Sequence, residues 1–279
     1  MHKEHESKPC CLYKFRDFEN KYHLKSVENS EFWFASPEEF NDPYDCNIPI
    51  RFDLCSKDWL YKQYLEFLSV DFPSLSLEEA KQKALKYADD PFRWKTQKKR
   101  IAANIGIFSL ASYWNKFESQ LMWSHYSKSH QGFVIGLSRR VLQDWVDDIA
   151  NSDHSIRARF AQVKYRKEIP RLLPCEMDEN EIVRKIITYK SQAWSYEEEI
   201  RLSIGKITVD DSLLSLSRKD RLQKLPPNVI QEITVGTNAS SLNIDKIKNI
   251  LKANGSKVKL YQATPNLDDF SFERLPIDY

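Results

Sequence analysis

Apolar and polar residues alternate in several short segments, and successive side chains of a β-strand point to opposite faces of a sheet. CLYKFR (11–16) and EFWFAS (31–36) follow this pattern, and a turn-rich segment joins them. We expect these two segments to form an opening pair of strands. NIGIFSLAS (104–112) and GFVIGLS (132–138) are typical of buried strands, and RFAQVKY (159–165) of a further strand.

Apolar residues spaced three and four positions apart predict helices. The longest such region is 54–104, where WLYKQYLEFL and LEEAKQKALKYA occur and Ser76 begins a capping-box-like SLEE. We expect this region to be mainly helical and to lie outside the main sheet, as an insertion or lid. The same spacing predicts helices over 118–127, 139–150 and 179–194.

SPEEFNDPYD (36–45) predicts a helical turn capped by Ser36, with Pro37 at its first position, followed by a rigid Asn-Asp-Pro loop. Near the C-terminus, VIQEITVG, SLNIDKIKNILKANG and KVKLYQA predict strand, helix and strand, and Gly255 stops the helix. The chain contains no internal repeat and no low-complexity linker. The sequence therefore predicts a single α+β domain over residues 1–279, with a mixed or antiparallel central sheet and the helical insertion at 54–104.

Charge and composition narrow the classes of function. The 279 residues carry a formal net charge of +2, which gives no overall attraction to nucleic acid or membrane. RWKTQKKR (93–100) is the one obvious basic patch, and its simplest interpretation is the solvated face of a helix. No apolar run approaches the roughly 20 residues that span a bilayer, and the N-terminus lacks the apolar segment of a secretion signal. We expect a cytoplasmic protein without a membrane partner.

The metal-ligating residue types are scattered. Five cysteines form an odd set without a CxxC pair, so we expect reduced thiols rather than a disulfide framework or a zinc site. His125 and His130 are spaced too widely to serve as ligands on adjacent turns of one helix. We therefore expect no metal.

WSYEEEIRL (194–202) concentrates charge beside apolar residues. If the segment is a strand, its two faces separate the apolar side chains from the charged ones. One face then carries Trp194, Tyr196, Glu198, Ile200 and Leu202, and the other carries Glu197, Glu199, Arg201 and Ser203. The charged face is either a solvated surface on which Arg201 screens Glu197, or a site in which neighbouring charges adjust the pKa of Glu199.

Several segments resemble an uncharacterised bacterial family of domains of unknown function, of the DUF 2971 type. They are, in chain order, LYKFR, FASPEEFNDPYD, IFSLAS, LMWSHYSKSHQGFVIGL, VKYR and KSQAWSYEEEIRL. The resemblance extends over most of the chain, from about residue 11 to 236. It implies no established activity, but it marks the residues that belong to one pattern.

A second resemblance concerns mechanism. Arg16 in YKFR, Ser109 in IFSLAS and the glutamates 197–199 occur in the order in which ADP-ribosyltransferases present an early Arg or His, a middle Ser and a late Glu-x-Glu. The resemblance implies a split sheet, NAD as cofactor, and cleavage of the nicotinamide glycosidic bond with transfer of ADP-ribose to an unknown acceptor, or its hydrolysis. It also implies an effector of a bacterial toxin or phage-defence system.

Each of these side chains has a chemical role and a structural alternative. Arg16 offers a fork of donors that suits a pyrophosphate, or forms a salt bridge. In a transferase, we expect Ser109 to hold a ribose or carboxamide group; otherwise its hydroxyl is simply satisfied by a hydrogen bond. We expect Glu199 to stabilise an oxocarbenium-like centre and Glu197 to orient or activate the acceptor.

Further candidates surround the same predicted elements. Aromatic side chains could stack on a nicotinamide or adenine ring, although aromatics at helical spacing are more often core residues. These aromatics are Tyr13, Trp123, Tyr126, Trp194 and Tyr196. His125 is a base or hydrogen-bond donor, or a buried helix histidine bonded to a backbone carbonyl. We also expect the loop of Asn41, Asp42 and Pro43 to lie near the pocket, and Arg201 to contribute to ligand binding.

Two other classes of function stay open. In the first, the protein is a non-catalytic ligand-sensing or interaction module, and Arg16, Glu197, Glu199 and Arg201 form a structural ion-pair network. In the second, it is a nuclease or RNA-binding protein that uses the basic helix around Lys98. A concave pocket joining Arg16, Ser109 and Glu199 favours the transferase, whereas burial of these residues in mutual pairs favours the module. For both the transferase and the ligand-sensing module, the expected partner is a nucleotide-like small molecule.

Overall fold

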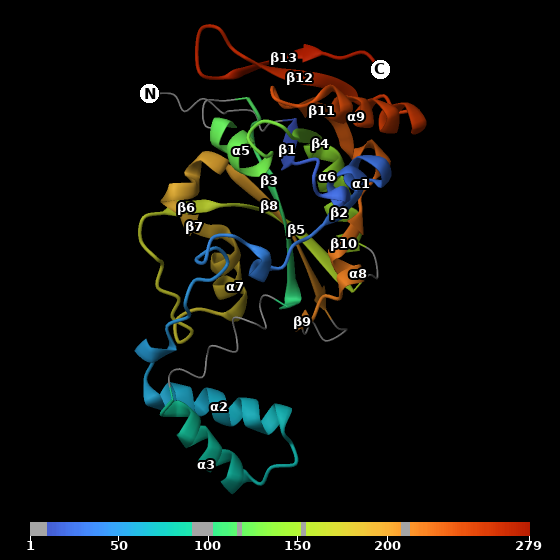
Figure 1. The fold of residues 1–279 in the computed structure, drawn as a ribbon. Helices are drawn as coiled ribbons and strands as arrows, with labels where there is room; N and C mark the ends of the chain where they lie inside the picture. The colour runs from blue at the N-terminus through green and yellow to red at the C-terminus, as the bar shows by residue number, and fades with distance from the viewer. Residues whose placement is uncertain (1–9, 91–102, 116–118, 152–154, 208–212) are drawn as a thin grey trace, which may run out of the picture.

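The computed structural model describes residues 10–90, 103–115, 119–151, 155–207 and 213–279 (Figure 1). Nine of the described strands form one sheet in the order β13-β12-β11-β4-β1-β3-β8-β5, with β9 beside β8. Within this sheet β11 and β12 are parallel, and the other pairs are antiparallel. The strands are β1 (Cys11–Arg16), β3 (Ile105–Ala111), β4 (Phe133–Ser138), β5 (Ile156–Gln162), β8 (Glu199–Ile207), β9 (Leu213–Leu214), β11 (Ile230–Val235), β12 (Lys259–Pro265) and β13 (Phe272–Pro276). The predicted α+β class and mixed sheet are confirmed.

Helices cover both faces of the sheet. In β4, Phe133, Ile135 and Leu137 belong to the largest apolar cluster, whereas Val134 belongs to a second one, as strand alternation requires. The first face packs against α1 (Lys21–Asn29), α6 (Arg139–Asn151) and α9 (Ser241–Ala253). The second packs against α5 (Ser119–Tyr126) and α7 (Glu179–Thr188), which Figure 1 shows on the other side of the sheet.

Strand β1 lies in the middle of the sheet but is joined unequally to its two neighbours. It pairs with β4 over its whole length, from Cys11 opposite Ser138 to Arg16 opposite Phe133. With β3 it shares a single residue pair, Tyr13 and Ala111. The sheet is therefore nearly divided between β1 and β3.

The expected pairing of the first two strands is wrong. Strand β2 (Glu31–Trp33) pairs with β10 (Leu222–Lys224) in a separate two-stranded sheet. The linking segment forms α1 instead of a turn, because the Asn20 side chain caps the helix by accepting from the Tyr22 amide at 3.0 Å. The helix carries the chain away from β1 before β2 begins.

The helical region after residue 54 contains α2 (Lys57–Asp71) and α3 (Leu77–Ala88), which pack against each other apart from the sheet (Figure 1). This α2–α3 hairpin has small apolar clusters of its own around Leu60 and Leu68. The expected capping box at Ser76 is present. The basic segment 93–100, with Lys98, lies outside the described residues.

Other local predictions met mixed outcomes. Ser36 caps the turn η1 (Pro37–Glu39) as expected. The helix expected over 179–194 ends at Thr188. It is followed by β7 (Tyr189–Ser191), which pairs with β6 (Lys164–Arg166), and by the 3₁₀ helix η3 (Gln192–Glu197). No described helix is long and apolar enough to cross a lipid bilayer.

The turn between α5 and β4 depends on close backbone contact. Residues 128–130 have positive φ angles of 49°, 53° and 65°. A Cβ atom on Gly132 would collide with the carbonyl oxygen of Arg16, and one on Gly236 with that of His130. The absence of a side chain at Gly132 therefore keeps this turn against the end of β1.

We predict that Gly132→Ala destabilises the protein by about 2 to 3 kcal/mol, because the backbone of β1 must move. Gly255 has φ of 56° but no atom within 4 Å of its Cβ position, so Gly255→Ala should cost only about 1 kcal/mol. Urea unfolding of both variants measures the difference. Equal losses would show that the close approach at Gly132 is not limiting.

Candidate functional site

A cluster of buried charges lies where β8 begins. Arg201 is 1% exposed and donates from Nε to Glu199 Oε1 at 2.8 Å and from Nη2 to Glu199 Oε2 at 2.9 Å. Its Nη2 also donates to both carboxylate oxygens of Asp45 at 2.8 Å, and Nη1 donates to the Ile187 carbonyl oxygen at 2.8 Å. Arg201 therefore joins β8 to the Asp45 loop and to the end of α7.

Lys190 is the second cation of the cluster. Its Nζ lies 3.1 Å from Asp45 Oδ2, 2.5 Å from Glu197 Oε2 and 3.2 Å from Glu199 Oε2, and its side chain is 6% exposed. We call Asp45, Lys190, Glu197, Glu199 and Arg201 the buried charge cluster. Its three carboxylates face two cations, so each charge has partners of opposite sign.

The local backbone places both Glu197 and Glu199 in the cluster. The strand interpretation of WSYEEEIRL fails for residues 194–198, because Trp194 and Tyr196 lie in η3. Glu198 adopts a left-handed conformation with φ of 40°, and its amide donates to the Ser195 carbonyl oxygen at 3.2 Å. The strand begins only at Glu199. From there the expected alternation is confirmed, since Ile200 and Leu202 enter the largest apolar cluster.

The two glutamates have pKa values that move apart. Burial alone would raise the pKa of Glu199, but Arg201, Lys190 and the Ser109 side chain together lower it below its usual range. Burial raises the pKa of Glu197; Lys190 opposes this shift and the charge of Glu199 adds to it. Glu199 is therefore held as the carboxylate, and Glu197 is the member that takes up a proton more readily.

Two tyrosine hydroxyls form hydrogen bonds with residues of the buried charge cluster. Tyr126 donates to Glu197 Oε1 at 2.6 Å, and burial with the charge of Glu197 raises the pKa of Tyr126 far above its usual value. The Tyr165 hydroxyl accepts from the Glu199 amide at 2.8 Å. These contacts tie α5 and β6 to the start of β8.

Lys14 lies on β1, beside the place where β3 diverges. Its Nζ donates to the Ser109 carbonyl oxygen at 2.7 Å and lies 5.1 Å from the centroid of the Phe108 ring. Burial and the charge of Arg16 lower the pKa of Lys14 to about 7, although Glu199 and Glu197 act in the opposite direction. Lys14 therefore lies within electrostatic reach of both Arg16 and the buried charge cluster.

Arg16, two residues further along β1, is incompletely paired. Its Nη1 lies 3.5 Å from His23 Nε2, and its buried Nε has no partner. Burial lowers the pKa of Arg16 to about 10 and that of His23 to about 4, so His23 is neutral near pH 7. The carboxylate that acts on Arg16 is Asp17, which lies 3.1 Å from His23 Nδ1.

The structure brings part of the predicted site together. Three predicted site residues belong to the cluster, namely Glu197, Glu199 and Arg201, and Tyr126 contacts it. Ser109 on β3 is the strand partner of Arg201 on β8 and adjoins the cluster. The Asn-Asp-Pro loop reaches the cluster through Asp45, whose amide donates to the Asp42 carbonyl oxygen at 3.1 Å.

Of that loop, Asn41 itself is exposed, whereas Asp42 is 7% exposed and its Oδ2 has no partner. The loop therefore contributes to the cluster by Asp45 rather than by the two residues singled out from the sequence.

Other candidates lie elsewhere. The Tyr13 hydroxyl donates to Glu232 Oε1 at 3.3 Å, away from the cluster. Trp123 is completely buried, and its Nε1 donates to the Trp114 carbonyl oxygen at 3.0 Å, so it is a core residue. His125 is exposed, in contrast to the buried-histidine alternative, and its ring lies 6.2 Å from that of Tyr196.

Sequence reasoning missed Asp45, Lys190, Tyr165 and Lys14. Asp45 ends the NDPYD motif and Lys190 begins KSQAW, so both lay inside segments already recognised as one pattern. Lys14 interrupts an apolar strand, which was a usable signal. Tyr165 likewise lay inside the recognised segment VKYR, but its contact with Glu199 depends on the packing of β6.

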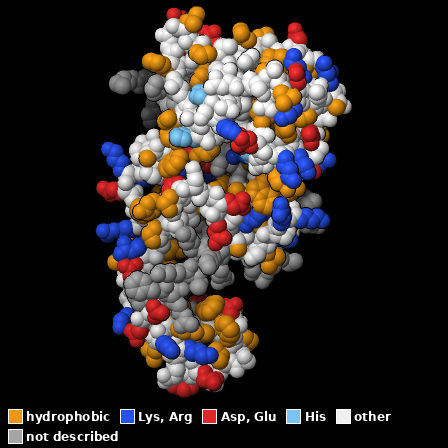
Figure 2. All heavy atoms as spheres, in the orientation of Figure 1, with side chains coloured by type: hydrophobic (Ala, Val, Ile, Leu, Met, Phe, Trp, Pro, Cys, Tyr) orange, Lys and Arg blue, Asp and Glu red, His pale blue; other side chains and the backbone are white. Residues whose placement is uncertain are grey.

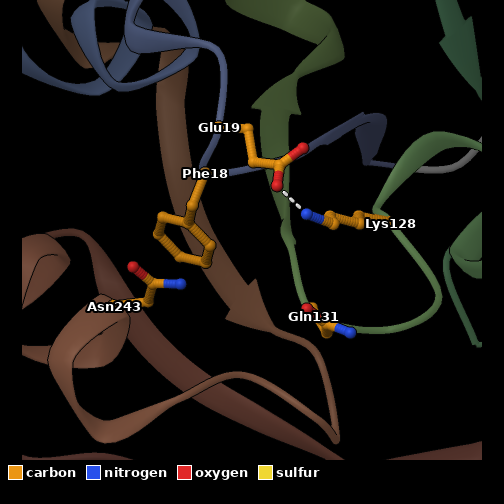
Figure 3. Close-up of a pocket in the computed structure, with 5 residues that line it drawn as sticks. All are labelled: Phe18, Glu19, Lys128, Gln131 and Asn243. Atoms are coloured by element: carbon orange, nitrogen blue, oxygen red, sulfur yellow. Dashed lines mark ion pairs between the residues drawn. The ribbon is translucent and has the colours of Figure 1, made fainter.

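The pocket shown in Figure 3 is separate from the buried charge cluster. It has a volume of about 100 Å³ and is lined by Phe18, Glu19, Lys128, Gln131 and Asn243, with an ion pair between Lys128 and Glu19. Sites for ligands of drug size occupy about 300 to 1,000 Å³, so this cavity is too small for a nucleotide.

Figure 2 shows that the surface is hollowed near the middle of the view and that basic and acidic side chains are interspersed on this face. The visible face therefore carries no extended patch of one sign. Among the residues that the structure describes, no group of three or more His, Cys, Asp or Glu side chains is arranged to hold a metal ion.

A family model described as "Protein of unknown function (DUF2971)" matches residues 122–202. The match runs from α5 into β8 and includes Tyr126, Lys190, Glu197, Glu199 and Arg201. It confirms the resemblance to this uncharacterised family. No curated protein and no solved structure matches the chain. The resemblance to ADP-ribosyltransferases stays a hypothesis.

We predict that Arg201→Met destabilises the protein by about 3 to 5 kcal/mol, because it leaves Glu199 and Asp45 buried with less compensating charge. Arg140, exposed on α6, provides the matched control Arg140→Met, which should change stability by less than about 0.5 kcal/mol. Denaturant unfolding measures both variants. A loss for Arg201→Met no larger than that for the control would contradict a structural role of the cluster.

Proposed function

We propose that this protein is a ligand-sensing module that binds a phosphate-bearing, nucleotide-like molecule beside β1, and that the buried charge cluster supports the site structurally. The observation that carries the proposal is the state of Arg16, a poorly solvated cation whose Nε has no partner. The guanidinium fork matches phosphate oxygens in geometry and charge.

The charges on β1 favour an anionic ligand. Lys14 and Arg16 are two residues apart on one strand, and burial together with the charge of Arg16 lowers the pKa of Lys14 to about 7. Both side chains are half-buried, so they retain access to solvent. A bound phosphate would offset the cost of holding two cations together where hydration is poor.

The backbone supports the same place. After the pair of Tyr13 with Ala111, β1 and β3 have no further residue pairs, so the backbone of β1 from Lys14 to Arg16 is not paired with β3, and only the Lys14 side chain reaches it, at the Ser109 carbonyl oxygen. Pyrophosphates of NAD, ADP-ribose or ADP have the required charge, and NAD is the ligand that the resemblance to ADP-ribosyltransferases implies.

The environment of Glu199 argues for support rather than catalysis. Its side chain is 3% exposed, and both of its oxygens accept from Arg201, with Lys190 3.2 Å from Oε2. A carboxylate that stabilises an oxocarbenium ion must face the sugar and keep its charge free to act there. In this arrangement the charge of Glu199 is already committed to Arg201 and Lys190.

One observation favours cleavage of the nicotinamide glycosidic bond as a second candidate function. Glu197 and Glu199 are neighbouring carboxylates whose pKa values move in opposite directions, which is a property of acid–base pairs in glycosyl chemistry. Glu197 lies beside the half-buried rings of Tyr126 and Tyr196. In this alternative the acceptor of ADP-ribose is unknown, and a toxin or phage-defence role would follow from the activity.

We predict that Arg16→Gln weakens binding of ADP-ribose, NAD or ADP at least about tenfold, since a hydrogen bond to a charged group contributes about 1.5 to 3 kcal/mol. Arg140→Gln is the matched control and should bind like the wild type. Isothermal titration calorimetry measures the affinities. Equal affinities for the Arg16 and Arg140 variants, or no binding of any of the three ligands by the wild type, would contradict the site.

The same titrations should depend on pH. The pKa of Lys14 is lowered to about 7 in the free protein, so Lys14 loses its proton as pH rises through 7, and an anion binds the protonated form better. Affinity should therefore fall between pH 6 and pH 8, with proton uptake on binding at the higher pH. The Lys14→Met variant should bind more weakly and lose most of this pH dependence.

For the second candidate function, the measurement is release of nicotinamide from NAD. If the carboxylate pair is catalytic, Glu197→Gln and Glu199→Gln each reduce turnover by roughly a hundredfold or more. Melting curves accompany each assay, so that loss of fold is separated from loss of activity. If the wild type releases no nicotinamide while it binds NAD in the titrations, the ligand-sensing proposal stands and the catalytic alternative fails.

A further inference from the structure

Two cysteines far apart in the sequence lie in direct contact. The Cys55 thiol donates to Cys175 Sγ, and the two sulfur atoms are 2.7 Å apart although 120 positions separate them in the chain. Both residues are free and half-exposed. The other three cysteines lie elsewhere: Cys46 is buried beside Arg201, and Cys10 and Cys11 are neighbours at the start of β1.

The backbones on both sides keep these thiols together. Ile50 and Leu172 form a parallel bridge, and the Arg51 amide donates to the Leu172 carbonyl oxygen at 2.8 Å. The Cys55 amide donates to the Phe52 carbonyl oxygen at 2.9 Å, which closes the turn η2 (Phe52–Leu54). The contact of the two sulfurs is thus part of a hydrogen-bonded junction between two segments.

The Cys175 side of the junction is equally well defined. The amides of Glu176 and Met177 both donate to the Leu173 carbonyl oxygen at 3.0 Å, and Asp178 caps α7. On the other side, Ser56 caps α2 one residue after Cys55. The pair therefore lies between the starts of α2 and α7.

We propose that Cys55 and Cys175 form a redox site, in which a hydroperoxide or a small-molecule disulfide converts the two thiols into a disulfide that fastens the α2–α3 hairpin to the segment before α7. This inference is independent of the proposed ligand site on β1. A covalent S–S bond is about 2.05 Å long, so only a small movement separates the thiol pair from the disulfide.

The chemistry balances with one equivalent of oxidant. With hydrogen peroxide, the Cys175 thiolate attacks an oxygen atom, the O–O bond breaks, and a sulfenic acid and hydroxide form. The Cys55 sulfur then attacks the sulfenic sulfur, the S–O bond breaks, and the hydroxyl group leaves as water with the Cys55 proton, while the hydroxide takes up the proton that Cys175 lost. Two thiols and one peroxide give one disulfide and two waters.

Burial raises the pKa of Cys55 to about 12, which makes Cys55 the resolving rather than the first attacking thiol.

The bond would act on the part of the fold that is least attached to the sheet. The α2–α3 hairpin has its own small clusters, and Cys55 packs against the one around Phe52 and Leu60. On the other side, the last turn of α7 contains the Ile187 carbonyl oxygen that accepts from Arg201. Oxidation would therefore tie the base of the hairpin to the helix that enters the buried charge cluster.

The test begins with the full-length wild-type protein in glutathione buffers of increasing oxidised fraction, and separately with one equivalent of hydrogen peroxide. Free thiols are alkylated, and peptides are mapped by mass spectrometry. The expected result is one linked peptide pair containing Cys55 and Cys175, with a mass loss of two hydrogen atoms that a reductant reverses. The melting temperature should rise by about 5 °C or more, because the bond closes a long loop.

Matched variants separate this pair from the other thiols. Cys10→Ser should form the same linked peptides and show the same thermal shift, whereas Cys55→Ser and Cys175→Ser should show neither. Should either variant fail to fold, the alkylation map of the wild type still decides. The proposal is overturned if Cys55 and Cys175 remain alkylated in the most oxidising buffer, if they acquire only separate glutathione adducts, or if the linked peptides contain other cysteines.

Discussion

The burial of Arg201 is the constraint on which much of this structure depends. A guanidinium loses its hydration when it is buried, so its donors must find acceptors within the protein. Glu199, Asp45 and the Ile187 carbonyl provide them from three segments that are distant in sequence. The loop after η1, the end of α7 and the start of β8 must therefore meet at one point.

The contacts of Lys190 and Tyr126 follow from the position of Arg201. The carboxylates gathered by Arg201 carry more negative charge than one guanidinium offsets, and Lys190 supplies the remaining cation from β7. Glu197 then has one oxygen left for Tyr126 on α5. Interactions of this kind contribute less to net stability than to the choice of one arrangement over others, because desolvation offsets much of the attraction.

The sequence predicted the local structure better than it predicted the partners. Alternation and helical spacing identified most of the large elements, including the strand, helix and strand near the C-terminus, because each pattern is set by neighbours within a few residues. Periodicity failed at residues 194–198, where the left-handed Glu198 interrupts a segment that alternates like a strand. It also assigned the wrong partner to β2, since pairing between strands depends on the path of the chain between them.

The candidate site shows the same division. The charged face of Glu199, Arg201 and Ser203 follows from two-residue alternation alone. Alternation does not show that Asp45 and Lys190 neutralise this face. Both residues come from other segments and approach it only when the chain is folded. The unpartnered Nε of Arg16 was likewise invisible, since a sequence records which donors exist but not which acceptors reach them.

The single residue pair between β1 and β3 has a consequence for the response to temperature. Elsewhere in the sheet, adjacent strands are held largely by backbone hydrogen bonds, whereas across this boundary cohesion comes mainly from side chains of the largest apolar cluster, such as Leu12, Phe108 and Leu110. Attraction between apolar groups weakens on cooling. The boundary between β1 and β3 is therefore the part of the sheet that cold loosens first, while the strand pairs on either side retain their hydrogen bonds.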